Sequence, residues 1–427
     1  MLKFTKKVGR SDASVGTRSK HFWLDVWANH TTRDMIRYFD WPLFLIVLGI
    51  CLFGIVCIFS ATSSEVTSTP STIMEMLETQ SITYPRLQLI WLGCGIGIMC
   101  VLVAFPYQKF KQISMIIYVL NLFALMFTLV VAKAGRGSMK AFLSWGNDRG
   151  LQTSEFGKIA MIISLSASFA ALKRPIERLK ETFSYVVMLA APLILVVLQP
   201  DFGTAMVYLA IFCVLVFVSG TNRKLIWGVL AAAVVVALTY WVYLMNTSSS
   251  SSFRATRILI WLDPDSYPDD ARQVINAQIA VGSGGIWGKG IVSPGSFASL
   301  GYISDDHTDF IFAIVCESFG LVGGCSLVLA YALLIARMIH IALRAKDRFG
   351  AMLVMGCVGM LVFHIVENLC MVIGLTPVTG IPLPFVSYGG SNMLTNMCAI
   401  GLTESVAMRS RYASANTGKT SKKTVDL

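Results

Sequence analysis

Long runs of apolar residues recur along this 427-residue chain, separated by polar or charged connections. A bilayer core about 30 Å thick is crossed by a helix of about 20 apolar residues. The pattern therefore predicts about ten transmembrane helices, of which the fourth to sixth are short and closely spaced. The predicted spans are 41–61, 86–105, 112–133, 156–172, 184–199, 203–220, 224–245, 310–338, 349–374 and 388–408.

Two connections depart from this pattern. Residues 246–309 are mostly polar and carry seven aspartates. Within them, 271–281 has the periodicity of an amphipathic helix, which we expect to lie on the membrane surface. Residues 374–391 hold three prolines, four glycines and no charge, so they cannot form a straight helix. Irregular backbone at membrane depth is tolerated only where it is packed or lines a cavity, which predicts a packed re-entrant or surface-embedded loop.

Composition supports a membrane protein. Hydrophobic residues make up 55% of the chain and charged residues 14%, whereas soluble domains carry about 25% charged residues. A disordered chain, a fibrous protein and a water-soluble enzyme are excluded, and an all-α polytopic membrane protein remains. Nearly all of the ten cysteines lie in apolar runs and none forms a C-x-x-C pair. We interpret them as small hydrophobic residues, neither disulfides nor zinc ligands.

Charge sets the predicted orientation. Of the 35 Lys and Arg, 25 fall in the termini and the even-numbered connections, so that side is predicted to be cytoplasmic. Residues 1–40 are then a basic cytoplasmic segment, 41–408 the transmembrane domain with a long outer loop at 246–309, and 409–427 a basic cytoplasmic tail. This distribution accounts for the net charge of +11. The basic ends are expected to contact anionic lipid, and no nucleic acid is expected as a partner.

Ionisable residues at the edge of a span are functional candidates, but each also has a structural interpretation. Asp309 stands at the start of the eighth predicted span. Either Asp309 or Thr308 could cap that helix, because both residue types are favoured there. Asp201 could cap the sixth span in the same way.

Two further pairs of ionisable residues could be either functional or structural. Glu155 and Lys158 open the fourth span and could pair at i,i+3. His364 and Glu367, within the ninth span, could form an internal hydrogen-bonded pair. Gly320-x-x-x-Gly324 is typical of a helix-packing contact. Asp201, Asp309, Glu155 and Lys158 all fall on the predicted outer side, where they are expected to face one cavity.

Three motifs occur in order along the chain: Gln199-Pro200-Asp201-x-Gly203-Thr204, the run His307–Ala313, and the run Pro382–Ser391. With these motifs, most of the chain resembles the SEDS family of peptidoglycan polymerases, the RodA/FtsW proteins. Leu262-Asp263-Pro264, followed by the segment 280–285, and Asp40-Trp41 look more like the RodA elongation branch than the FtsW division branch.

The resemblance implies polymerisation of lipid II into glycan strands at the outer face of the bacterial cytoplasmic membrane. It implies a class B penicillin-binding protein as transpeptidase partner within a cell-wall elongation complex. It makes Asp309 the essential aspartate, and Glu155, Lys158 and Asp201 polar cavity residues. The chain departs from the family at Thr153, where proline is usual, and at Ala141, where tryptophan is usual.

Chemistry on a sugar linked through pyrophosphate to a lipid needs a general base and a stabilised leaving group. Asp309 is the candidate base. The leaving group needs positive charge, supplied by side chains or by a divalent cation such as Mg²⁺ or Mn²⁺. The proline-rich loop is expected to shape the entry for the lipid tail. Candidate cations are Lys158, Lys140, Arg136 and Arg257; candidate substrate contacts are Glu155, Asp201, Ser387, Gly389 and Gly390.

Other functions stay open at this point. A lipid II flippase or other transporter would use the same charges as a pathway, and such proteins often have inverted repeats; no convincing repeat is found. A scaffold for a cell-wall complex would keep partner binding and cell shape after Asp309→Asn. A division-type polymerase of the same family is a further alternative.

Overall fold

The computed structural model describes residues 37–62, 82–131, 133–134, 141–144, 150–172, 176, 179–199, 201–222, 228, 253–303 and 306–425. Nine of the ten predicted spans coincide with helices, and the span 224–245 lies outside the described residues apart from residue 228. The helices are α3 (Trp41–Ala61), α5 (Thr83–Ala104), α6 (Tyr107–Gln112), α7 (Ser114–Val131), α8 (Thr153–Ala170), α9 (Leu179–Leu198), α10 (Phe202–Val218), α12 (Phe253–Leu262), α13 (Pro268–Ser283), α14 (Ile311–Leu343), α15 (Arg348–Val372) and α16 (Gly390–Val425).

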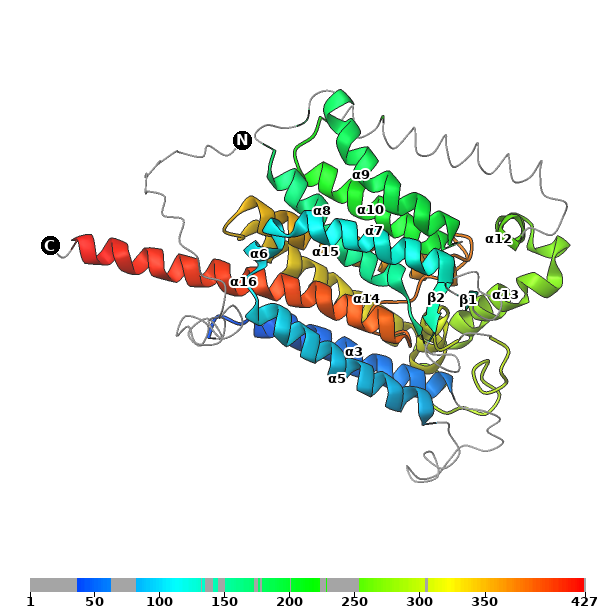
Figure 1. Cartoon of the computed structure of the whole chain (residues 1–427). Helices are drawn as coiled ribbons and strands as arrows, with labels where there is room; N and C mark the ends of the chain where they lie inside the picture. The colour runs from blue at the N-terminus through cyan, green and yellow to red at the C-terminus, as the bar shows by residue number, and fades with distance from the viewer. Residues whose placement is uncertain are drawn as a thin grey trace.

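The long helices lie side by side in one bundle (Figure 1). Among the described residues, α3, α5, α14 and α15 are long and apolar enough to cross a membrane, and α7, α9 and α10 contain shorter apolar stretches. These helices confirm a polytopic helical membrane fold. The exception to an all-α chain is a small antiparallel sheet of β1 (Lys133–Ala134), β2 (Ala141–Ser144) and β3 (Gly150–Leu151).

Helix α15 is the centre of the bundle. It packs against α8, α10, α14 and α16. Of its most apolar stretch, 72% is buried, compared with 28% for α5. Side chains on α15 therefore reach several neighbouring helices, which matters for the candidate site.

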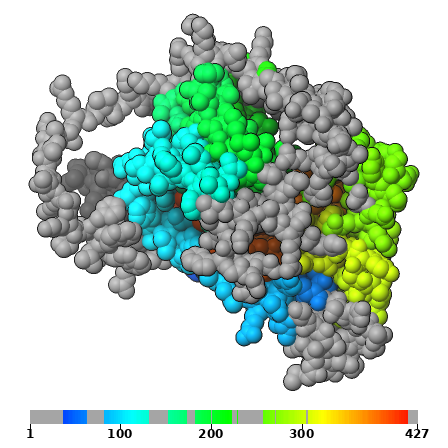
Figure 2. All heavy atoms as spheres, turned by 45° about the vertical axis from the view of Figure 1, so that its right-hand side comes forward, coloured from blue at the N-terminus to red at the C-terminus, as the bar shows by residue number. Residues whose placement is uncertain are grey.

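One end of the bundle carries α12, α13 and the 3₁₀ turn η1 (Pro264–Ser266), and α16 projects from the opposite end (Figure 1). Following the predicted orientation, we call these the outer end and the inner end. Figure 2 turns the outer end forward, with residues 264–303 in yellow-green at its right. The periodic segment 271–281 is helical, as predicted, and packs against α14. Its buried side chains are Ala271, Ala277 and Ala280.

The long helix α14 is broken at Gly320, whose φ of 65° and ψ of −163° are not helical. The segment after α13 supplies hydrogen bonds at the break: Leu321 N donates to Gly285 O (2.9 Å) and Gly290 N donates to Ser318 O (3.0 Å). A Cβ on Gly320 would lie 2.4 Å from Gly288 N. The interpretation of Gly320 and Gly324 as a packing motif between two helices is therefore wrong for Gly320. The missing side chain of Gly320 instead allows close contact with the backbone of Ile286 and Gly288.

The proline-rich loop between α15 and α16 is packed, as predicted. Val386 and Leu383 are fully buried, and Phe385 is 1% exposed. A Cβ on Gly54 of α3 would lie 2.6 Å from Val386 Cα, so helix and loop backbones are in close contact. Phe385 has a φ of 66°, a conformation that costs a non-glycine residue of order 1–3 kcal/mol. The surrounding helices must hold the loop in this shape.

At the inner end, a buried acid joins three helices. Asp40 caps α3 by accepting a hydrogen bond from Leu43 N (3.2 Å). Its carboxylate also accepts from Arg337 Nη2 of α14 (2.9 Å) and from Arg411 of α16. Helix α16 continues without interruption from the predicted span through the predicted tail to Val425.

Candidate active site at the outer end

The turn before α14 holds Asp309 through its backbone. Three successive carbonyl groups, of residues 307, 308 and 309, accept hydrogen bonds from other parts of the chain. Two donors belong to the proline-rich loop and one to α15, so the turn is fixed from two sides. The bonds are Tyr388 N to His307 O (2.9 Å), Ser387 Oγ to Thr308 O (2.6 Å) and Asn368 Nδ2 to Asp309 O (2.8 Å).

Ser387 is a junction within this arrangement. It is 1% exposed, and its hydroxyl oxygen accepts a hydrogen bond from Leu383 N (2.8 Å) while donating to Thr308 O. Gln88 of α5 donates to Ser387 O (3.1 Å). Substrate contact by Ser387 stays a prediction; its visible role is to join the proline-rich loop to the turn that carries Asp309.

The two glycines after Ser387 lie where the loop meets α5. Gly389 N donates to Gln88 Oε1 (3.4 Å). A Cβ on Gly390 would lie 2.5 Å from the indole of Trp91, so only glycine fits at the start of α16. This close approach gives Gly390 a packing role, and contact of either glycine with substrate stays a prediction.

The side chain of Asp309 is half-buried. The N-cap position of α14 is occupied by Phe310, which makes no side-chain cap hydrogen bond. The interpretation of Asp309 or Thr308 as the N-cap residue is therefore wrong. The carboxylate instead interacts electrostatically with Arg257 of α12: burial lowers the pKa of the guanidinium and the charge of Asp309 opposes that shift.

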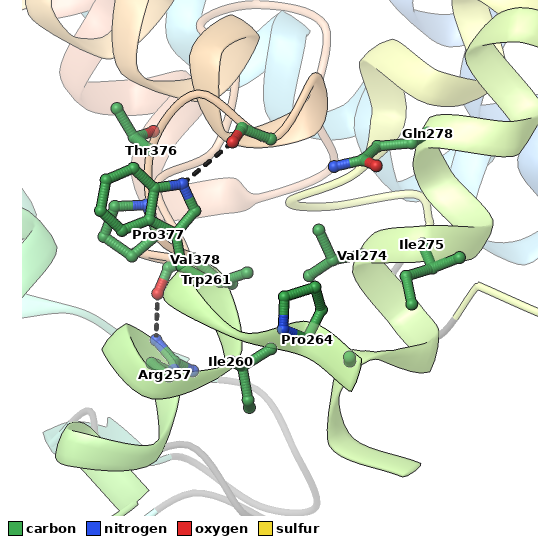
Figure 3. Close-up of a pocket in the computed structure, with 12 residues that line it drawn as sticks. Arg257, Ile260, Trp261, Pro264, Val274, Ile275, Gln278, Thr376, Pro377 and Val378 are labelled. Atoms are coloured by element: carbon green, nitrogen blue, oxygen red, sulfur yellow. Dashed lines mark hydrogen bonds between the residues drawn. The ribbon is translucent and has the colours of Figure 1, made fainter. Parts of the chain in front are cut away.

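Helix α12 is fastened to the proline-rich loop by two side chains one helical turn apart. Arg257 Nη1 donates to Val378 O (3.0 Å) and Trp261 Nε1 donates to Gly374 O (2.9 Å) (Figure 3). Between α12, α13 and this loop lies a cavity of about 70 Å³, whose lining includes Gln278 and Thr376. It is too small for a disaccharide, and Arg257 at its edge is held by the bond to Val378 O.

The predicted pair of Glu155 and Lys158 forms. Lys158 Nζ donates to Glu155 Oε2 (2.7 Å) and lies 3.0 Å from His364 Nε2 of α15. The side chain of Lys158 is 1% exposed. The predicted pair of His364 and Glu367 is therefore wrong, because His364 bonds to Lys158 of α8. Glu367 Oε1 has no hydrogen-bond partner among the described residues. A role of Lys158 at the pyrophosphate stays a prediction.

Asp201 is the N-cap of α10, as its structural interpretation predicted. It is 2% exposed. Its carboxylate accepts hydrogen bonds from Thr204 N (3.3 Å), Thr204 Oγ1 (2.8 Å), Gln152 Nε2 (2.7 Å) and Ser154 Oγ (2.8 Å). The acid joins the starts of α8 and α10 and has a structural role independent of any substrate.

The match to a known family decides the class of this chain. A family profile described as "Cell cycle protein", FtsW/RodA/SpoVE, matches residues 41–412. The chain belongs to the FtsW/RodA/SpoVE family. The matched residues include the turn with Asp309, the proline-rich loop and the Asp201 junction.

Curated FtsW/RodA/SpoVE relatives carry the name of an enzyme. The chain is 30% identical to "Peptidoglycan glycosyltransferase MrdB" of Escherichia coli (strain K12), over 86% of this chain and 93% of the relative. It is 29% identical to "Probable peptidoglycan glycosyltransferase FtsW" of Bacillus subtilis (strain 168), over 89% of this chain and 93% of the relative. These similar identities leave the RodA and FtsW branches unseparated.

Solved FtsW/RodA/SpoVE structures share the fold. A chain described as "Structural coordination of polymerization and crosslinking by a peptidoglycan synthase complex" aligns with a TM-score of 0.69 at 27% identity, covering 87% of this chain and 98% of that chain. Rod shape determining protein RodA of Thermus thermophilus aligns with a TM-score of 0.61 at 26% identity, covering 88% and 98%. The alignments extend over nearly the whole of both solved chains.

Two predicted cation sites remain untested. Lys140 and Arg136 lie outside the described residues. Within the described ranges, no three His, Cys, Asp or Glu side chains are grouped to hold a metal ion. Mg²⁺ can be bound by as few as one or two carboxylates, so a divalent cation at Asp309 stays a prediction.

Sequence reasoning missed two residues that hold the site together. Asn368 of α15 donates to both Asp309 O and Ile381 O, each at 2.8 Å. Gln88 of α5 bonds to the backbone on both sides of Tyr388. Both are amides buried to 0% exposure inside apolar helices. A buried amide in a membrane span is a signal that could have drawn attention to them.

Proposed function

We infer that this protein is a peptidoglycan glycosyltransferase that polymerises lipid II into glycan strands at the outer face of the bacterial cytoplasmic membrane. Membership of the FtsW/RodA/SpoVE family supports the enzyme class. The observation that carries the mechanism is the fixation of Asp309 through its backbone oxygen, which holds a half-buried acid within electrostatic reach of Arg257. An acid held in this way is suited to act as a base without rearrangement.

The reaction we propose joins two sugars with inversion. A hydroxyl group of the acceptor sugar attacks the anomeric carbon of the donor, and its proton passes to the Asp309 carboxylate. The bond from the anomeric carbon to the pyrophosphate oxygen breaks, and the polyprenyl pyrophosphate leaves with the electron pair. Arg257 stabilises the negative charge that develops on the leaving group. A divalent cation bound by Asp309 and the pyrophosphate would supply further positive charge.

The test is lipid II polymerisation by the purified protein in proteoliposomes, comparing Asp309→Asn with Asp265→Asn. Asp265 is an exposed aspartate of the same outer loop and serves as the matched control. Loss of a general base lowers the rate about 10²–10⁴-fold, so Asp309→Asn should nearly abolish glycan synthesis while Asp265→Asn retains it. Near-normal synthesis by folded Asp309→Asn would remove Asp309 from this role.

Two further experiments test whether the protein transports lipid II and whether it needs a divalent cation. Lipid II supplied on one face only distinguishes polymerisation in place from transport across the bilayer. A chelator followed by Mg²⁺ or Mn²⁺ tests the divalent cation: activity that falls and then returns assigns it a role. Activity that is indifferent to chelator leaves the charge to Arg257 and the other side-chain cations.

We also propose that the chain serves cell elongation together with a class B penicillin-binding protein. The RodA-like Leu262-Asp263-Pro264 and Asp40-Trp41 support the branch. The similarity to a chain of a peptidoglycan synthase complex supports the partner. Rescue of rod shape in cells depleted of their elongation polymerase, with no rescue in cells depleted of the division polymerase, tests the branch. Co-purification with the transpeptidase tests the partner.

A further inference from the structure

Three aromatic rings from distant parts of the sequence meet at the outer end of the bundle. Tyr84 belongs to the first turn of α5, His307 to the turn before α14, and Tyr388 to the end of the proline-rich loop. The ring centroids of Tyr84 and His307 are 4.5 Å apart, those of Tyr84 and Tyr388 5.0 Å, and those of His307 and Tyr388 5.8 Å. We call these three residues the aromatic platform.

The platform differs from the aromatic residues of the core. Tyr107, Tyr208 and Tyr331 are at most 2% exposed. Tyr84, in contrast, is 37% exposed, and the side chain of His307 is 21% exposed. Tyr84 and His307 therefore keep part of their surface exposed, unlike the aromatic residues of the core.

A buried acid orients the imidazole of the platform. Asp306 is 9% exposed, and its Oδ1 lies 3.1 Å from His307 Nδ1. A carboxylate only accepts hydrogen bonds, so this contact places a proton on Nδ1. In a neutral imidazole, Nε2 is then the acceptor. The platform therefore combines ring faces with a polar group of defined direction.

The platform is rigidly connected to Asp309. His307 lies two residues before Asp309, and its carbonyl accepts the hydrogen bond from Tyr388 N (2.9 Å). The same contact joins two platform residues and fixes the turn that carries Asp309. A ligand resting on the rings is thus held at a constant position relative to the acid.

We propose that the aromatic platform is a sugar-binding subsite, on which a pyranose ring of the lipid-linked saccharide stacks next to Asp309. One face of a pyranose consists of C–H groups and its rim of hydroxyl groups. The C–H face suits the negative face of an aromatic ring, and the rim suits the imidazole nitrogen of His307. Binding sites commonly combine aromatic walls with a few directed polar groups in this way. This inference rests on the proposed function and names how its substrate is held.

Equilibrium binding in the Asp309→Asn background tests the platform without turnover. The two probes are lipid II and polyprenyl pyrophosphate, which lacks the sugars. Tyr84→Leu removes one ring and Tyr84→Phe keeps it. Tyr302→Leu is the control, because Tyr302 is a 50% exposed aromatic outside the platform, in the outer loop that also carries His307. His307→Gln provides a second platform variant if Tyr84→Leu does not fold.

Stacking on one ring contributes about threefold to tenfold in affinity. Tyr84→Leu and His307→Gln should weaken lipid II binding by that factor and leave polyprenyl pyrophosphate binding unchanged, while Tyr84→Phe and Tyr302→Leu stay within about twofold of the parent. An equal loss for both probes, or no loss for lipid II, overturns the platform. Polymerisation by the wild-type protein is measured in parallel. Wild-type synthesis together with binding that does not depend on the rings rejects the platform alone, and ring-dependent binding without wild-type synthesis rejects the proposed function alone.

Discussion

The region around Asp201 and the region around Asp309 both present an acid just before an apolar helix at the outer end. The Asp201 carboxylate is 2% exposed and accepts four hydrogen bonds from α8 and α10. Asp309 is half-buried, and Asn368 donates a hydrogen bond to its backbone oxygen. Side-chain bonds therefore join two helices at Asp201, and main-chain bonds anchor the turn that carries Asp309.

This difference separates a structural acid from a reactive one. Protonation or ligand contact at Asp201 would break hydrogen bonds that join two helices, and buried donors left without partners are costly. At Asp309 the main-chain bond fixes the position of the residue, and a change of protonation at the carboxylate leaves that bond intact. The comparison can be tested with variants. Changes at the buried, fully hydrogen-bonded sites should lower protein stability, and changes at Asp309 should lower the polymerisation rate.

The largest effect on stability is expected from Lys158→Met, at a second buried site of the structural kind. The change leaves the Glu155 carboxylate buried without its cation, and breaking one partner of such a pair costs about 3–5 kcal/mol. The apparent Tm in detergent should fall strongly. The double variant Glu155→Gln with Lys158→Met removes both charges and should recover most of the loss. A double variant as unstable as the single one would show that packing, and not charge pairing, determines the effect.

Asp201→Ala should come next in size. It removes a helix cap, which is worth about 0.5–2 kcal/mol, and leaves Gln152 Nε2 and Ser154 Oγ buried without their acceptor, each at about 1–3 kcal/mol. We expect a lower apparent Tm and a lower yield of folded protein, with polymerisation per folded molecule largely kept. A loss of turnover at unchanged stability would place Asp201 with Asp309.

Asp309→Glu isolates geometry from charge. The carboxylate is retained but displaced by one methylene on a backbone that is fixed, and a displacement of about 1 Å can lower a rate about 100-fold. Polymerisation should fall by about that factor while the apparent Tm stays that of the parent, because the carboxylate charge and the main-chain bond from Asn368 are both retained. Asp269→Glu, at an exposed aspartate of α13, is the matched control and should behave as the parent.

The helices could be predicted because the requirement that a span be apolar is local, and nine predicted spans coincide with helices. Asp309 could be singled out as a candidate functional residue because it is an ionisable residue at the start of a predicted span. The bond between Lys158 and His364, 206 positions apart, could not be predicted, because periodicity carries no information on which helices are neighbours. Gly320 was misinterpreted because the same glycine spacing serves a helix contact and a helix break.

The smallest effect, and the finest test of the comparison, is expected from Asn368→Leu. Leucine keeps the approximate volume but removes the donor that holds Asp309 O and Ile381 O. The turn keeps its bonds from Ser387 and Tyr388, so the acid should become less well positioned but not lost, and we expect about a tenfold fall in kcat. Because Asn368 bonds to the backbone oxygen and not to substrate, KM for lipid II should change little. A rise in KM at constant kcat would mean that the amide contacts the substrate, and fixation of the main chain would then not be what distinguishes Asp309 from Asp201.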